Sequence, residues 1–126
     1  MRGVARAGAL AVAIALTVPF SAPAGNAFDS RVSIKVEYPE KGNPAALSGR
    51  VRSGKAACER QRKVKVIRRD QGETSVFGRD LTDGAGRWRF EPTPNVPNGT
   101  YRAVAVAKRI GAGRCLRARS ESVFVD

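Results

Sequence analysis

The chain carries at positions 82–90 the run Thr82-Asp83-Gly84-Ala85-Gly86-Arg87-Trp88-Arg89-Phe90. Asp83 can cap a turn through its carboxylate, and Gly84 and Gly86 can adopt the left-handed backbone angles that other residues avoid. After this turn two aromatic residues alternate with two arginines, the period-2 pattern of a strand with one buried face. The run therefore predicts a tight turn followed by a strand that places Trp88 in the core.

The same alternation recurs on both sides of this run, whereas helical periodicity does not. Segments rich in Gly, Pro and Asn separate the alternating stretches and are typical of turns. We therefore predict a single all-β domain, an antiparallel β-sandwich of about seven strands in two packed sheets. The expected strands are 32–36, 47–52, 63–67, 75–79, 87–90, 101–107 and 116–125, and the expected core residues are Val51, Val64, Val66, Trp88 and Tyr101.

Segment 101–107 fits two arrangements. Tyr101 and Ala103 share one face of the expected strand, while Val104 and Val106 share the other. Either the strand is central and covered on both sides, or a bulge shifts its register. The sequence leaves both arrangements open.

The first 27 residues have the pattern of a secretory signal peptide. Two arginines precede the uncharged run Ala7–Val18, which is shorter than the roughly 20 residues needed to cross a bilayer. Small residues fit cleavage after Ala24 or Ala27, of which we favour Ala27. We therefore expect residues 1–27 to be removed and residues 28–126 to form a secreted or otherwise extracytoplasmic domain without a membrane span.

Cys58 and Cys115 are the two cysteines of the sequence. In an exported chain an unpaired exposed thiol is a liability, and redox-active pairs usually lie close together in a C-x-x-C motif. The sequence therefore predicts a structural disulfide between Cys58 and Cys115.

The composition excludes several classes of catalytic site. The absence of histidine removes Ser–His and Cys–His dyads and every His-ligated metal site. Asp80-Leu81-Thr82-Asp83-Gly84 lacks the acidic spacing of a calcium loop, and the acidic residues are scattered rather than paired. We expect a protein that is not an enzyme and holds no metal or cofactor.

The sequence has 23 basic and 11 acidic residues. Residues 1–27 contain two basic residues and no acidic residue, so residues 28–126 carry a net charge of +10. On the polar side of strands these residues can form a stripe that binds nucleic acid, an anionic wall polymer or an acidic polysaccharide. A GC-rich genome would produce the same arginine excess without selection for binding, and the sequence shows no exposed aromatic residue among them for stacking. The candidate polyanion-binding residues are Arg50, Arg52, Lys63, Lys65, Arg87, Arg89 and Arg102.

Two motifs resemble those of a known family. The run 82–90 has the form T-D-x-x-G-x-aromatic, and Pro97-Asn98-Gly99-Thr100-Tyr101 forms a P-x-G-x-Y turn into a strand. Together with Leu47–Val51 and Val64–Val66, these motifs resemble the carboxypeptidase regulatory-like family of transthyretin-like (prealbumin/Ig-like) β-sandwich domains. The chain as a whole resembles a small secreted bacterial protein that contains such a domain. The resemblance implies a non-catalytic accessory or binding module. Its turn and core residues here are Thr82, Asp83, Gly86, Trp88, Gly99 and Tyr101.

These observations favour a secreted, non-catalytic β-sandwich of structural or binding type, at the cell envelope or outside the cell. Its partner would be an anionic envelope polymer or another extracellular protein. The alternative is a polyanion-binding module that uses a basic strand face. One contiguous basic face would favour this alternative, whereas evenly spread charge would favour the first interpretation.

Overall fold

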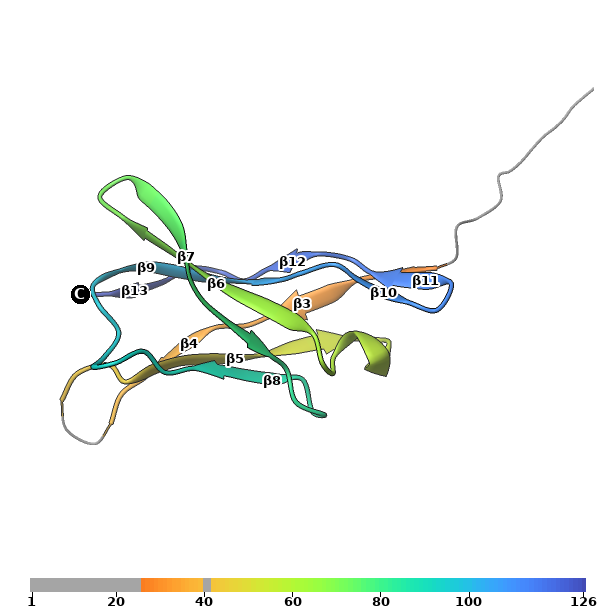
Figure 1. The fold of residues 1–126 in the computed structure, drawn as a ribbon, viewed down its shortest axis with the longest axis horizontal. Helices are drawn as coiled ribbons and strands as arrows, with labels where there is room; N and C mark the ends of the chain where they lie inside the picture. The colour runs from red at the N-terminus through yellow and green to blue at the C-terminus, as the bar shows by residue number, and fades with distance from the viewer. Residues whose placement is uncertain (1–25, 40–41) are drawn as a thin grey trace, which may run out of the picture.

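The computed structural model describes residues 26–39 and 42–126, which form a two-layered antiparallel β-sandwich (Figure 1). This confirms the predicted all-β fold class. No helix in the described part of the chain is long and apolar enough to span a membrane. One layer contains β3 (Ser30–Val32), β4 (Lys35–Glu37), β5 (Ala46–Ser53) and β8 (Arg87–Phe90). The other contains β6 (Lys63–Asp70), β7 (Glu73–Leu81), β9 (Gly99–Ala105), β12 (Ala118–Arg119) and β13 (Val123–Val125).

The strand expected at residues 32–36 is interrupted, because its backbone turns inward over β5. Both β3 and β4 pair with β5 in one register, but Ser33 and Ile34 between them lie outside the strands. The Ser33 carbonyl accepts a hydrogen bond of 3.3 Å from Trp88 Nε1. It also lies so close to Gly49 that a Cβ at that position would be 1.9 Å from the carbonyl oxygen. Glycine at position 49 therefore permits the break.

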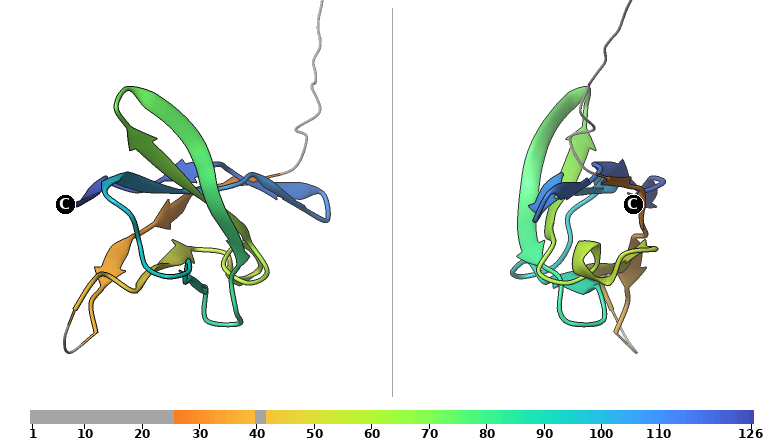
Figure 2. Two further views of the ribbon diagram at one scale, coloured as in Figure 1. Left: turned by 60° about the vertical axis from the view of Figure 1, so that its left-hand side comes forward. Right: turned by 90° about the vertical axis from the view of Figure 1, so that its right-hand side faces the viewer.

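In the second layer β9 is the central strand, between β6 on one side and β12 and β13 on the other. The register of β9 with β6 is regular, so β9 is central, as in the first of the two predicted arrangements. Thr100 and Arg102 on its outer face are partly exposed, so the expected cover on both sides is incomplete. A bulge lies instead between β6 and β7, at Val66 and Ile67. The hairpin formed by β6 and β7 projects beyond the rest of the sandwich (Figures 1 and 2).

The last expected strand, 116–125, is divided into β12 and β13. Ser120 lies between them and is hydrogen-bonded to β9 although it belongs to neither strand. Its backbone nitrogen donates to the Ala103 carbonyl at 2.9 Å. Its hydroxyl accepts a hydrogen bond of 2.8 Å from the Ala103 nitrogen. The segment therefore stays attached to β9 through the interruption.

A small third sheet was not predicted. It consists of β10 (Lys108–Ile110), β11 (Gly113–Cys115) and β2 (Ala27–Phe28), with β2 parallel to β11. Cys115 is the last residue of β11. A 3₁₀ helix at Ala56–Cys58 brings the other cysteine to it, and the predicted disulfide is present, with the two Cα atoms 5.6 Å apart.

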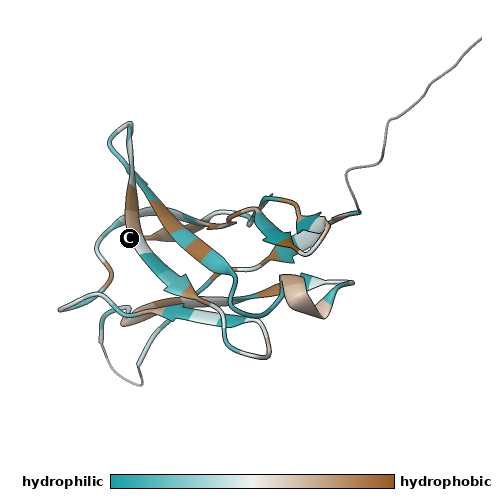
Figure 3. Cartoon of the chain, turned by 45° about the vertical axis from the view of Figure 1, so that its right-hand side comes forward, coloured by the Kyte–Doolittle hydropathy of each residue, from teal (hydrophilic) through white to brown (hydrophobic). Residues whose placement is uncertain are grey.

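The expected signal peptide lies almost wholly outside the described residues, which begin at Asn26. Within the described part, the expected core is confirmed. Trp88 is 2% exposed, and Val51, Val64, Val66 and Tyr101 are at most 1% exposed. Hydrophobic and hydrophilic residues alternate along the strands, as the bands in Figure 3 show.

The turn of residues 82–87 is capped by Asp83, as predicted. Its Oδ1 accepts hydrogen bonds from the Ala85 and Arg87 nitrogens at 2.8 and 2.9 Å. These bonds, that of Arg87 most strongly, lower the pKa of Asp83. Gly86 has the expected positive φ of 81°, but the prediction was wrong for Gly84. The Gly86 nitrogen donates to the Asp83 carbonyl, so Gly84 is a central turn residue with negative φ and the positive angle falls on Gly86.

Candidate polyanion-binding face

The seven basic residues that the sequence singled out lie on two different faces of the sandwich. On the layer of β5 and β8, the outward-facing members are Arg50, Arg52, Arg87 and Arg89, as the pairing of Arg50 with Arg87 shows. Lys63, Lys65 and Arg102 belong to β6 and β9 in the other layer. Because the core separates the two groups, the seven residues do not form one stripe.

Two of the four arginines on the layer of β5 and β8 already have partners within the chain. Arg89 forms ion pairs with Glu91 at 2.8 Å and Glu37 at 3.0 Å, and these two carboxylates raise the pKa of Arg89. Arg50 Nε donates to the Ala85 carbonyl at 2.9 Å. The charge of Arg89 is therefore compensated internally, whereas Arg52 and Arg87 form no ion pair within the described residues.

The outward face of β7, β6, β9, β12 and β13, which we call the five-stranded face, is different. Within residues 26–39 and 42–126, none of its basic side chains forms an ion pair. Val104 shows how closely they cover the sheet. It points outward and does not pack among the core residues, yet only 5% of its surface is exposed. The stems of long basic side chains can cover apolar surface in this way. The basic residues of the five-stranded face are Lys63, Lys65, Arg69, Arg79, Arg102, Arg117 and Arg119.

Four arginines of this face surround a hollow of about 450 Å³, which we call the arginine hollow. It is lined by Arg69, Arg102, Arg117 and Arg119, together with Ile67, Val104, Tyr101 and the hydroxyl-bearing residues Thr74, Thr100 and Ser122, and no carboxylate among the described residues lines it.

Arg102 is incompletely bonded in this hollow. Its Nη2 donates to Ser122 Oγ at 2.8 Å, but its buried Nε has no acceptor among the described residues. Buried donors without acceptors are rare because each costs free energy. Arg102 Nε is therefore a donor at the arginine hollow that the described residues leave unpaired.

A second hollow, of about 660 Å³, lies on the same face and is lined by Lys63, Lys65 and Arg79 with Val64, Leu81 and Val106; we call it the lysine hollow. One carboxylate, Asp80, also lines it. Asp80 Oδ2 accepts a hydrogen bond of 2.8 Å from the Arg89 backbone nitrogen, which directs it toward β8.

Sequence reasoning missed Arg69, Arg79, Arg117 and Arg119. Arg117 and Arg119 are two residues apart in the expected strand 116–125, so period-2 alternation could have placed them on one face. Their closeness to Arg102 follows from the pairing of Arg119 with Val104, which alternation alone does not predict.

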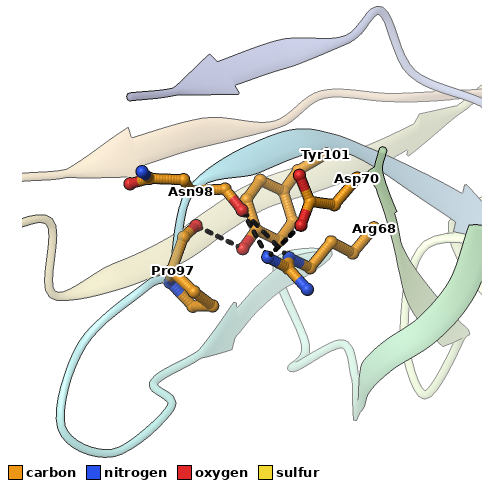
Figure 4. Close-up of polar contacts among 5 residues, drawn as sticks. All are labelled: Arg68, Asp70, Pro97, Asn98 and Tyr101. Carbon is orange, nitrogen blue, oxygen red and sulfur yellow. Dashed lines mark hydrogen bonds and ion pairs between the residues drawn. The ribbon is translucent and has the colours of Figure 1, made fainter. Parts of the chain in front are cut away.

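Arg68 belongs to the fold and not to this face (Figure 4). Its guanidinium donates to the Asn98 carbonyl from Nε and Nη2 and pairs with Asp70 at 3.2 Å. Beside it, the Tyr101 hydroxyl donates to the Pro97 carbonyl at 2.6 Å, the geometry of the tyrosine corner of β-sandwiches. Burial raises the pKa of the Tyr101 hydroxyl. The Pro97–Tyr101 motif therefore has a structural role.

Comparison with known proteins identifies no family. No family model and no curated protein matches the chain, so its resemblance to carboxypeptidase regulatory-like domains stays a prediction. Among solved structures, the chain is similar to a tetra-tandem repeat in the extending region of a large adhesion protein, with a TM-score of 0.46 and 15% identity. The match covers 79% of this chain and 24% of that one, so the chain spans about a quarter of the solved chain.

Proposed function

We propose that this protein is an exported, non-catalytic β-sandwich that binds a linear polyanion through the five-stranded face. One observation carries the proposal: within the described residues none of the seven basic side chains of the five-stranded face forms an ion pair, whereas on the opposite layer Glu37 and Glu91 neutralise Arg89. A surface of one charge sign attracts polyions of the other sign and speeds their association. The five-stranded face therefore presents seven basic side chains, none of which an ion pair within the described residues neutralises.

Two further features support export and a non-catalytic role. The signal-peptide pattern of residues 1–27 and the disulfide both fit an oxidising compartment. Several carboxylates that an enzyme could use serve the fold instead. Asp83 caps a turn, Asp70 pairs with Arg68, and Glu59 accepts a hydrogen bond from the Ser53 nitrogen at 2.9 Å.

The test compares two variants of the exported protein that have equal net charge on a heparin column. R102Q/R119Q removes two charges from the five-stranded face, and R31Q/R52Q removes two exposed charges from the opposite layer. We expect the first variant to elute at clearly lower salt than the second, since binding depends on where the charges lie. R31Q/R52Q should keep the wild-type unfolding midpoint, because exposed charges contribute little to stability. Arg102 is half-buried, so the unfolding midpoint of R102Q/R119Q is measured as well, to show that this variant is folded under the conditions of the column.

Equal elution of the two variants would show that heparin senses bulk charge alone, and the proposed binding face would be wrong. Later elution of R102Q/R119Q than of R31Q/R52Q would move the binding surface to the opposite layer. Either outcome rejects the proposal.

A further inference from the structure

The two hollows of the five-stranded face are neighbours. Lys65, which lines the lysine hollow, pairs across the sheet with Val104, which lines the arginine hollow. On the far side, Val104 pairs with Arg119 of the arginine hollow. A ligand lying over Val104 therefore contacts basic residues of both hollows.

The sheet register sets the distance between the two hollows. The Val106 nitrogen donates to the Lys63 carbonyl, and Arg102 lies opposite Ile67. Lys63 and Ile67 are four residues apart along β6, which corresponds to about 13 Å at roughly 3.3 Å per residue. A single phosphate or sulfate group is much smaller than this separation, so it occupies one hollow, whereas a chain of such groups can occupy both.

The lining of the hollows indicates the chemistry of that chain. Arginine guanidiniums bind tetrahedral and planar oxyanions through paired donors, and hydroxyls add further hydrogen bonds. In the lysine hollow Leu81 is 55% exposed and offers apolar surface to the segment of the polymer between anionic groups.

Aromatic platforms for bases are missing from both hollows within the described residues. Tyr101 borders the arginine hollow, but its ring is fully buried and contacts Phe77. Proteins that bind single-stranded nucleic acid stack successive bases on exposed aromatic side chains. Phe124 is 67% exposed and pairs with Thr100, so one aromatic side chain lies beside the arginine hollow. The series of platforms that successive bases need is missing from both linings within the described residues, and the lining therefore favours a polymer without bases.

We infer that one linear, non-aromatic polymer carrying phosphate or sulfate groups lies along β6 and β9 and occupies the arginine and lysine hollows together. This inference rests on the proposed function and adds to it the class of ligand and its path. Linking two sites through one chain raises the apparent affinity without any new contact, by up to about 10²- to 10⁴-fold.

The experiment measures binding of tripolyphosphate and of long-chain polyphosphate to the exported protein by calorimetry at fixed salt. The variants are R102Q/R119Q for the arginine hollow, K63Q/K65Q for the lysine hollow and R31Q/R52Q as the charge-matched control. We expect the long chain to bind wild-type protein about 100-fold more tightly than tripolyphosphate. Each hollow variant should lose most of that advantage, and the control should retain it.

The outcomes separate the inference from the proposed function. If one hollow variant binds the long chain as tightly as wild-type protein, a single hollow holds the ligand and the inference is wrong, while the proposed face stands. If the control loses as much affinity as the hollow variants, both are wrong.

The source of the anionic groups is tested by comparing dextran sulfate and oligo(dT) with polyphosphate at matched numbers of charges. We expect dextran sulfate and polyphosphate to bind at least as tightly as oligo(dT). Tighter binding of oligo(dT), by about tenfold or more, would overturn the assignment to a non-aromatic polymer and indicate nucleic acid.

Discussion

Arg62 connects parts of the chain that are far apart in sequence. The residue is fully buried, and its Nε donates to the Val106 carbonyl at 2.6 Å. Nη1 donates to Ser30 Oγ and to the Cys58 carbonyl, both at 2.8 Å, and Nη2 donates to the Leu116 carbonyl at 2.6 Å. Burial lowers the pKa of Arg62. One side chain thus satisfies acceptors on both sides of the disulfide.

Replacing Arg62 with methionine should destabilise the protein strongly. Methionine fills much of the volume but leaves buried acceptors without donors, each of which costs about 1–3 kcal/mol. We expect R62M to lower the free energy of unfolding in urea by about 3 kcal/mol or more. R60M is the control, because Arg60 is exposed, and it should change little. Equal effects of the two variants would contradict the structural role of Arg62.

A Cβ at position 49 should be poorly tolerated. The Ser33 carbonyl oxygen would lie 1.9 Å from it, and this oxygen belongs to the backbone, so the two segments would have to separate. We expect G49A to lower the free energy of unfolding by about 3 kcal/mol. G54A, where a Cβ meets nothing within 4 Å, should have a near-neutral or slightly stabilising effect. A G49A variant as stable as G54A would show that the contact relaxes easily.

Strand β2 (Ala27–Phe28) lies at the expected signal-peptide cleavage site, so the position of cleavage decides whether it forms. The Asn26 carbonyl accepts a hydrogen bond from the Arg114 nitrogen at 2.9 Å, and the Phe28 carbonyl accepts one from Leu116 at 2.8 Å. Lys55 Nζ lies 5.5 Å from the centre of the Phe28 ring. Cleavage after Ala27 would remove the first of these hydrogen bonds, and cleavage after Ala24 would keep it.

The two expected mature chains should therefore differ in stability. We expect the chain that starts at Gly25 to be about 1 kcal/mol more stable than the chain that starts at Phe28, since one backbone hydrogen bond and its strand pairing are lost. Chemical denaturation of the two purified chains measures the difference, with hydrogen exchange at the Arg114 amide as a local readout. Identical exchange at that amide would show that β2 does not protect it.

At the scale of the whole molecule, the disulfide joins the small sheet to the 3₁₀ helix between β5 and β6. Its cysteines are 57 positions apart in the sequence and both are fully buried. A domain of this size buries a modest core, so a covalent link across the fold contributes a large share of its stability.

Removing the disulfide should lower stability substantially. The loop-closure model gives about 4 kcal/mol for a loop of this length. We expect C58A/C115A to have a lower urea midpoint than wild-type protein by a corresponding amount. Wild-type protein unfolded in the presence of a reductant should match the variant, and an unchanged midpoint in both would contradict the prediction.

The sequence alone determined the features that depend on neighbouring residues. Period-2 alternation predicted most strands and the core around Trp88, because side chains of a strand alternate between its two faces. The Asp83 cap and the positive φ at Gly86 follow from the chemistry of a few adjacent residues. The disulfide followed from composition and compartment, since Cys58 and Cys115 had no other partners.

The tertiary structure alone decided which charges remain free to bind. Alternation places both Arg89 and Arg102 on polar strand faces, but it carries no information on which strand lies beside them. Arg89 meets Glu37, 52 residues away, whereas Arg102 meets other arginines around one hollow. Such neighbours are set by sheet register and by the packing of the two layers, which join segments distant in the sequence. For this reason the basic residues could be counted from the sequence, whereas the face that they form could not be located without the fold.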